Sequence, residues 1–145
     1  MKINIKKLTD TAILPERGSA YAAGYDLFAD VKETIEIKAH TTAMIPTGLA
    51  MEIPEGYFGG IFARSGLASK ESLRPANCVG VVDADYRGEV KIILINLSDT
   101  DFTINSGDRV AQIVFARCEQ MEMVSVETLS ETERGAGGFG HTGKQ

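Results

Sequence analysis

The sequence predicts an all-β domain, built as a sandwich or barrel of short strands. Apolar and polar residues alternate with a period of two wherever the chain has a pattern, as half-buried strands require. Turns rich in glycine and proline recur between these stretches. No window of about a dozen residues keeps the i, i+3, i+4, i+7 apolar spacing of an amphipathic helix. Many short strands with frequent turns are typical of sandwiches and barrels.

Five stretches carry the strand pattern, and five turns punctuate the chain. We expect strands in residues 3–5, 35–37, 90–97, 110–115 and 121–126. We expect turns at residues 15–18, 46–48, 54–56, 86–88 and 105–108. The stretch 90–97 is apolar almost throughout and rich in isoleucine, which predicts a central strand buried on both faces. The best case for helix is residues 65–72, with room for one or two turns.

The chain has the size of one domain, and its composition changes only at the end. Its 145 residues are near the usual size of a single globular domain, and we assign residues 1–133 to it. Five of the 15 glycines fall in residues 134–145, so few side chains can anchor this segment and we expect a flexible arm. A lone Phe139 among glycines favours a lid that closes over a ligand, and an arm without function is the alternative.

Charge and cysteine content exclude several classes of function. The formal net charge of −5 disfavours binding to a nucleic acid polymer, which depends on many cationic contacts. Cys78 and Cys118 offer neither a disulfide framework nor the ligand spacing of a zinc or iron–sulfur site, which favours a reducing compartment. The first residues lack the apolar core of a secretory signal, and no stretch approaches the roughly 18 apolar residues of a membrane span. We therefore expect a cytoplasmic protein without a membrane partner.

Residues 64–66 carry groups that suit a phosphate. Arg64 offers paired donors, Ser65 offers a hydroxyl, and Gly66 lets backbone amides approach closely. We expect these residues in a loop after the apolar pair Ile61 and Phe62. The alternative is an ordinary turn with a solvated arginine, which is the commoner use of such residues.

A predicted strand leads directly into two carboxylates and an aromatic residue at 80–88. In an extended chain Asp83 and Asp85 point to the same face, where they could hold a metal, or one could orient a water molecule as a base. The alternative is a hairpin end, because Asp and Gly favour turns. Tyr86 belongs either to the same site or to the core, with its hydroxyl at the rim.

Two further polar residues stand out, although each has an ordinary structural explanation. Asp26 comes soon after Gly24, and acidic residues after a glycine usually just end a turn. Gln112 lies inside an apolar strand, where a buried amide without a hydrogen bond costs about 1 to 3 kcal/mol. Gln112 therefore needs a partner, either a structural one or a ligand.

Five segments, taken in order, resemble the five sequence motifs of the trimeric dUTPase family, the deoxyuridine triphosphate nucleotidohydrolases. They are AGYDLFAD at 23–30, ARSGLA at 63–68, GVVDADYRGEV at 80–90, SGDRVAQIVF at 106–115 and RGAGGFGHTG at 134–143. Ala63 stands where proline is frequent, and Thr142 stands where serine is common. The resemblance implies a jelly-roll β-barrel protomer in a homotrimer, with three active sites at the subunit interfaces. It also implies that water attacks the α-phosphorus of dUTP to give dUMP and pyrophosphate, which supplies dUMP and keeps uracil out of DNA.

The resemblance also implies a role for each motif residue. Asp83 is expected to orient and deprotonate the water, and a positioned base contributes about 10² to 10⁴ in rate. Asp26 is expected to hold Mg²⁺ through water, while the triphosphate oxygens bind the metal directly. The Tyr86 ring is expected to pack on the deoxyribose and leave no room for a 2′-hydroxyl. The residues expected to contact the phosphate chain are Arg64, Ser65, Gly66 and Gln112. Those expected to form the uracil pocket are Asn77, Gly80, Val81, Val82 and Asp83, with Lys91 nearby and the Phe139 ring stacked on the base. Those expected to approach the γ-phosphate end are Arg134, Gly140, His141 and Thr142.

Two other functions stay open on the sequence alone. A dCTP deaminase resembles this family in its fold and its arm, although DADYRGEV at 83–90 has the dUTPase form. A catalytically silent binding or regulatory homologue is expected to have lost Asp83, Arg64 or the arm, and this chain keeps all three.

Overall fold

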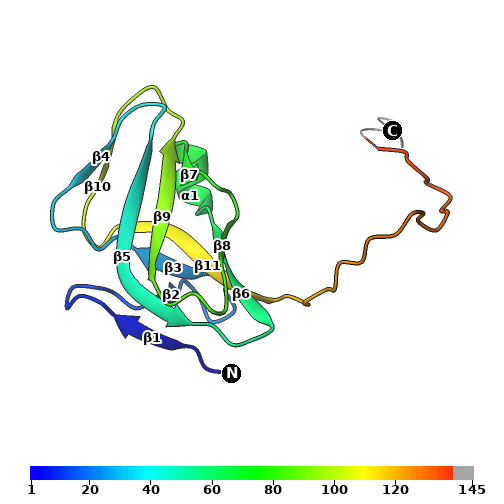
Figure 1. Ribbon diagram of the computed structural model, residues 1–145. Helices are drawn as coiled ribbons and strands as arrows, with labels where there is room; N and C mark the ends of the chain where they lie inside the picture. The colour runs from blue at the N-terminus through cyan, green and yellow to red at the C-terminus, as the bar shows by residue number, and fades with distance from the viewer. Residues whose placement is uncertain (139–145) are drawn as a thin grey trace.

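The structure is a computed structural model, and it describes residues 1–138 (Figure 1). This part of the chain is almost entirely strand, as the sequence predicts. The elements in order are β1 Asn4–Lys7, β2 Glu16–Arg17, β3 Tyr25–Phe28, β4 Ile35–Ile37, β5 Thr42–Glu52, β6 Tyr57–Phe62, α1 Ser65–Lys70, β7 Leu73–Pro75, β8 Gly80–Val82, β9 Glu89–Asn96, β10 Phe102–Ile104 and β11 Arg109–Arg117. Within residues 1–138, no helix is long and apolar enough to cross a membrane.

The strands form two main sheets that share one core. One sheet has four strands in the order β1-β5-β9-β7, and the other has five in the order β2-β3-β11-β6-β8. A two-stranded ribbon of β10 and β4 stands at one end of the molecule (Figure 1). The described pairings are antiparallel. The prediction of a sandwich or barrel is confirmed, and the fold is a jelly roll.

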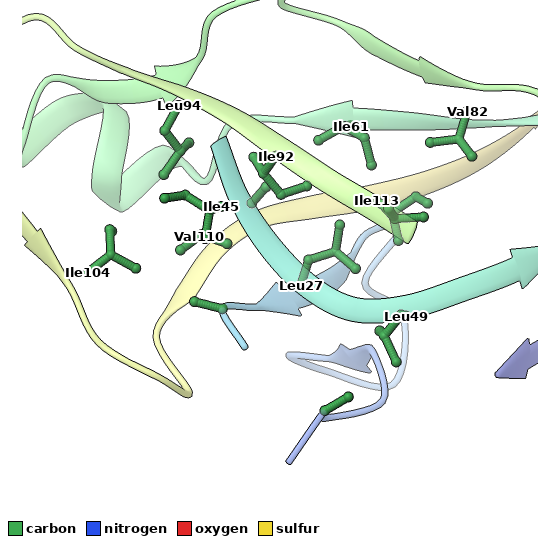
Figure 2. Close-up of a cluster of buried hydrophobic side chains, with 14 of the residues drawn as sticks. Leu27, Ile45, Leu49, Ile61, Val82, Ile92, Leu94, Ile104, Val110 and Ile113 are labelled. Atoms are coloured by element: carbon green, nitrogen blue, oxygen red, sulfur yellow. The ribbon is translucent and has the colours of Figure 1, made fainter. Parts of the chain in front are cut away.

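Apolar side chains from both sheets fill the space between them (Figure 2). Leu27 of β3 and Ile113 of β11 lie in one cluster with Ile45 of β5 and Ile92 of β9, and each of the four is at most 1% exposed. Burying an aliphatic side chain of this size contributes about 1.5 to 3 kcal/mol. The apolar residues that recur at every second position of a strand are thus the ones whose side chains point into this core.

The turn predicted at 46–48 is not a turn but a bend within β5. Gly48 has a φ of +64°, a conformation that glycine adopts without strain, and the register with β9 shifts between Pro46 and Ala50. A Cβ at Gly48 would also lie only 2.8 Å from the Cβ of Ala12. The glycine signal was read correctly as a change of direction, but hydrogen bonds to β9 and β1 continue the strand through it.

Two other turns and the helix follow the prediction. Gly56 has a φ of +78° in the turn before β6, and Gly107 has a φ of +85° in the turn before β11. The short helix predicted within 65–72 is confirmed as α1.

The stretch predicted as a central strand is β9, and it does lie between β5 and β7. The prediction that both of its faces are buried is wrong for the single chain. Val90, Ile92 and Leu94 face the core, whereas Ile93 on the opposite face is 36% exposed. The described part of one chain provides no layer over this outer face.

The chain leaves the barrel after β11. The strand predicted at 121–126 is wrong for the single chain, because these residues form no strand and extend away from the barrel (Figure 1). Their apolar side chains, among them Met121, Met123 and Val126, are exposed. The alternation of apolar and polar residues is real, but none of the strands described within residues 1–138 pairs with this stretch.

Candidate active site

Asp26 lies between two arginines on β3, next to the central strand β11 of the five-stranded sheet. Its Oδ1 accepts a hydrogen bond from Nε of Arg64 at 3.0 Å, and its Oδ2 accepts one from Nη1 of Arg109 at 3.3 Å. Nη1 of Arg64 also donates to the backbone carbonyl of Arg109 at 3.3 Å. The Asp26 side chain is only 17% exposed, so this ion pair is better shielded from water than a surface pair. One carboxylate against two guanidinium groups leaves a local excess of positive charge, which suits an anion.

Arg64 directly precedes helix α1, and its neighbours Ser65 and Gly66 are the first residues of that helix. Arg64 is the N-cap of α1, with an extended backbone at φ −82° and ψ 129°, and Ser65 and Gly66 form the first turn. The predicted loop placement therefore holds for Arg64, between β6 and α1, and is wrong for Ser65 and Gly66, where the donors predicted for a phosphate remain exposed. The guanidinium groups of Arg64 and Arg109 lie beside a hollow of about 330 Å³ that Leu67 and Phe102 also line.

Gln112 has a structural partner, as its place within an apolar strand requires. Its Nε2 donates to the backbone carbonyl of Ala63 at 2.9 Å, which ties β11 to the residue before Arg64. Gly24 on the neighbouring segment makes room for this amide, because a Cβ at Gly24 would lie 3.0 Å from Cδ of Gln112 and nearer still to Oε1. The side chain that was predicted to bind phosphate is thus oriented by backbone on two sides.

Arg109 is a site residue that sequence reasoning did not assign. In a regular strand, residues 109 and 112 point to opposite faces because side chains alternate. The pairing of β11 with β3 shifts register between Arg109 and Ala111, and a bulge of this kind redirects side chains. Arg109 can therefore reach Asp26, which pairs directly with Gln112 in the same sheet. A pattern search that allowed for a bulge after the Ser-Gly-Asp turn would have found it.

Asp83 stands where the chain crosses from one sheet to the other. It follows β8, which pairs with β6 in the five-stranded sheet, and β9 begins at Glu89 in the four-stranded sheet. The connection is a turn but not a hairpin, because β8 and β9 do not pair with each other. Asp83 and Asp85 do not share a strand face, since the chain turns between them and the Tyr86 N–H donates to the Asp83 carbonyl at 3.2 Å.

A second hollow of about 280 Å³ opens at this crossing. Several residues predicted for the base and sugar pocket line it together, namely Val81, Val82, Asp83, Tyr86 and Lys91. Lys91 lies 3.4 Å from Glu89 Oε2, and the Tyr86 hydroxyl donates to the Glu89 carbonyl at 3.0 Å. The structure thus brings a carboxylate, an aromatic ring and an ammonium group to one concave surface.

Asn77 lies at the entry to β8. A Cβ at Gly80 would lie 3.0 Å from Asn77 Nδ2, so the Asn77 amide rests against the glycine backbone. Asn77 is exposed, and it is not among the residues that line the second hollow.

The remaining predicted residues lie away from both hollows or outside the described residues. Arg134 is exposed in the segment that leads away from the barrel, where its Nε donates to the Gly137 carbonyl at 2.8 Å. Phe139, Gly140, His141 and Thr142 lie outside the described residues. The two hollows share no lining residue in a single chain, so Arg64 and Arg109, which bond Asp26, line a different surface from Asp83.

The donor set around Asp26 fits a cation that brings most of its own ligands. Within residues 1–138, no three His, Cys, Asp or Glu side chains gather into a group that could hold a metal ion. Mg²⁺ is commonly bound by one or two carboxylates together with water and substrate phosphates. A single, partly buried carboxylate on a rigid strand meets that requirement.

Three comparisons with known proteins agree. The dUTPase family model matches residues 10–143. A deoxyuridine 5′-triphosphate nucleotidohydrolase of Fusobacterium nucleatum subsp. nucleatum is 44% identical over 144 residues, which is 99% of each chain. The structure is similar to that of a dUTPase variant from Staphylococcus bacteriophage 80alpha bound to dUpNHpp, with a TM-score of 0.88, 31% identity and 98% of each chain covered.

A second similar solved structure is described for its bound metal ion. It is a dUTPase variant from phage phi11 of S. aureus, described for its coordination of a structural Mg(II) ion, with a TM-score of 0.77 and 30% identity over 88% of this chain and 98% of that one. Together with the match over most of the sequence, these likenesses confirm the family that the five motifs indicated. This chain belongs to the dUTPase family.

Proposed function

We propose that this protein hydrolyses dUTP to dUMP and pyrophosphate. The observation that carries the proposal is the hollow at the sheet crossing, where Asp83 shares one concave surface with Tyr86 and Lys91. A carboxylate beside a pocket of nucleotide size can orient a water molecule and take its proton. Asp83 is exposed, so water reaches it without any movement of the barrel.

The second hollow holds the nucleoside part of the substrate in this proposal. The backbone of residues 80–83 and the amide of Asn77, which lies against Gly80 beside the hollow, bind the uracil edge, and cytosine would leave those donors and acceptors unpaired. The Tyr86 ring packs on the deoxyribose and excludes a 2′-hydroxyl. Lys91 lies nearby on β9, at the edge of the same hollow.

The Asp26 group holds the phosphate chain. Arg64, Ser65, Gly66 and Gln112 supply cationic and neutral donors, and charge-assisted bonds from Arg64 are the strongest of these. Asp26 would hold Mg²⁺ through water, and the metal when bound would neutralise part of the triphosphate charge. Arg64 then exchanges the Asp26 carboxylate for phosphate oxygens, while Arg109 keeps its own contact with Asp26.

A homotrimer with sites at the subunit interfaces is part of the same proposal. Two facts support it: Arg64 and Arg109, the partners of Asp26, line a different hollow from Asp83 in one chain, and Met44, Val81 and Ile93 stay exposed around the Asp83 hollow. A neighbouring copy that covers these apolar side chains would bring its own phosphate-binding group to the hollow. The arm from Arg134 onward then closes over the site, with Phe139 on uracil and Gly140, His141 and Thr142 toward the γ-phosphate.

We also place the reaction in the cytoplasm. Cys78 and Cys118 are both free and exposed in the structure, which suits a reducing compartment.

The decisive experiment measures pyrophosphate and ammonia separately. The purified protein is incubated with Mg²⁺ and, in turn, with dUTP, dCTP, dTTP and UTP. Pyrophosphate release from dUTP alone is the expected result. Ammonia release from dCTP would identify a deaminase, and nucleotide binding without either product would identify a silent homologue.

A further inference from the structure

The ring of Tyr86 lies directly on Gly88. A Cβ at Gly88 would lie 2.6 Å from Cζ of Tyr86 and 3.0 Å from Cε2, and its nearest atom would be the phenol oxygen. Real Cβ atoms do not approach other heavy atoms below 3.0 Å. Any side chain at Gly88 would therefore have to displace the ring.

Backbone conformation does not explain this glycine. Gly56 and Gly107 have φ values of +78° and +85°, in the left-handed region that other residues rarely adopt. Gly88 has no such φ, although it also lies in a connection between strands. A left-handed φ is therefore not what requires glycine here, and the neighbouring ring is the obstacle that the structure shows.

One hydrogen bond holds the ring itself, and three more fix the backbone around it. The Tyr86 hydroxyl donates to the Glu89 carbonyl at 3.0 Å, and the Tyr86 N–H donates to the Asp83 carbonyl at 3.2 Å. Nη1 of Arg87 donates to the carbonyl of Tyr86 at 3.1 Å and to that of Ala84 at 2.6 Å. Tyr86 is 46% exposed and lines the hollow at the sheet crossing. Tyr86 thus contacts Gly88 and also lines the hollow at the sheet crossing.

We infer that Gly88 is a positioning residue for sugar selectivity, because its missing side chain lets the Tyr86 ring lie at the depth that admits deoxyribose and excludes ribose. This inference rests on the proposed function, in which the ring packs on the sugar. A methyl group at this position would need to push the ring by several tenths of an ångström or more, since ordinary van der Waals contacts to a Cβ begin near 3.4 Å. The displaced ring would encroach on the sugar or turn away from it, and in either case it would lose its fit to deoxyribose.

The test compares Gly88→Ala with the wild type for dUTP and for UTP. We expect kcat/KM for dUTP to fall at least tenfold, mainly through KM, and the ratio of kcat/KM for dUTP over UTP to change, because the displaced ring no longer fits the sugar. Gly18→Ala is the matched control, because a Cβ at Gly18 meets nothing within 4 Å and its φ lies outside the left-handed region. We expect that control to keep both constants.

A double variant shows whether the effect passes through the ring. In the Tyr86→Ala background, Gly88→Ala is expected to change neither the dUTP constant nor the ratio, since the side chain it would displace is gone. This double variant also serves if Gly88→Ala alone does not fold, because recovery of folding on removal of the ring would show the same clash.

Two outcomes would overturn the inference alone. One is an active wild type whose dUTP-to-UTP ratio is unchanged in Gly88→Ala. The other is a Gly88→Ala effect that is just as large without the tyrosine ring. A wild type that releases no pyrophosphate from dUTP would overturn the proposed function, and this inference with it.

Discussion

Arg64 donates from Nε to Oδ1 of Asp26 across 3.0 Å, so the carboxylate proposed to serve the metal is already held by a guanidinium group. Arg109 holds the other oxygen at 3.3 Å. Phosphate oxygens compete with a carboxylate for arginine, because both accept paired, charge-assisted hydrogen bonds. Substrate binding is therefore expected as an exchange of partners at Arg64, and Arg109 is the group that keeps Asp26 in place during it.

Removing the second guanidinium tests this arrangement. Arg109→Gln is expected to lower the free energy of unfolding by roughly 1 kcal/mol, since Arg109 is about half exposed and its ion pair is partly screened. We also expect a higher KM for Mg·dUTP and weaker nucleotide binding in equilibrium dialysis. Arg117→Gln on the same strand is the control, because Arg117 lies over the Tyr57 ring and not at Asp26. Unchanged nucleotide affinity in Arg109→Gln would contradict the positioning role.

The proposed base is tested by a substitution that keeps its shape. Asp83→Asn is expected to lower kcat by about 10² to 10⁴, the usual contribution of a positioned base, and to leave dUTP affinity largely intact. Single-turnover rates and dUTP binding measured on the same preparation separate the two effects. Near-normal turnover would remove Asp83 from the mechanism.

Truncation before Arg134 tests the arm. The truncated chain is expected to keep its barrel and its oligomeric state but to lose nearly all activity, because the described core lies wholly in residues before β11 ends. Circular dichroism, sedimentation velocity and pyrophosphate release would be measured together. A melted barrel would show that the arm is structural instead of catalytic.

An exposed ion pair predicts a small dependence of stability on pH. Lys38 lies 2.8 Å from Asp101 and 2.9 Å from Glu36. The hydrogen bond from Lys38 is the main cause that lowers the pKa of Asp101, and the same bond is the main cause that raises the pKa of Lys38.

The two shifts define the pH window. The Asp101 contribution is present above its usual pKa of about 3.9 and is lost as pH falls through the lowered value. The Lys38 contribution is present below about 10.4 and is lost as pH rises through the raised value. Asp101→Asn should therefore lower the melting temperature slightly at neutral pH, and this difference should vanish in acid. Asp10→Asn, another exposed carboxylate, is the control, and a constant difference across the acid range would contradict the assignment.

Local signals in the sequence predicted the fold class and several strands, but not β2 or β5, which lie where turns were expected at 15–18 and 46–48. The strands at 35–37 and 110–115 were found because alternation depends only on neighbouring residues, and β4 and β11 bear this out. The turn at Gly107 was found because a left-handed φ favours glycine wherever it occurs. The same signal at Gly48 predicts the change of direction but not the continued strand, because a bend and a turn differ only in whether distant strands keep their pairing.

Features that depend on distant contacts were missed. Arg109 reaches Asp26 through a register shift with β3, and strict alternation of side chains along the strand does not include such a shift. The outer face of β9 and the stretch 121–126 have the residues of buried strands but no covering layer in the described part of the chain. Both errors have the same physical cause. A pattern of apolar residues predicts that a strand face is buried, but it does not predict which part of the chain, or which other chain, covers that face.

Because the chain extends away from its barrel after β11, two defective forms of the protein are expected to complement each other in a mixed oligomer. If the arm of one copy closes the site of another, a lesion in the arm and a lesion in the barrel harm different sites. Asp83→Asn chains mixed with chains truncated before Arg134 would then form some sites with both an intact base and an intact arm. Two recessive alleles, each inactive by itself, would complement each other within one gene.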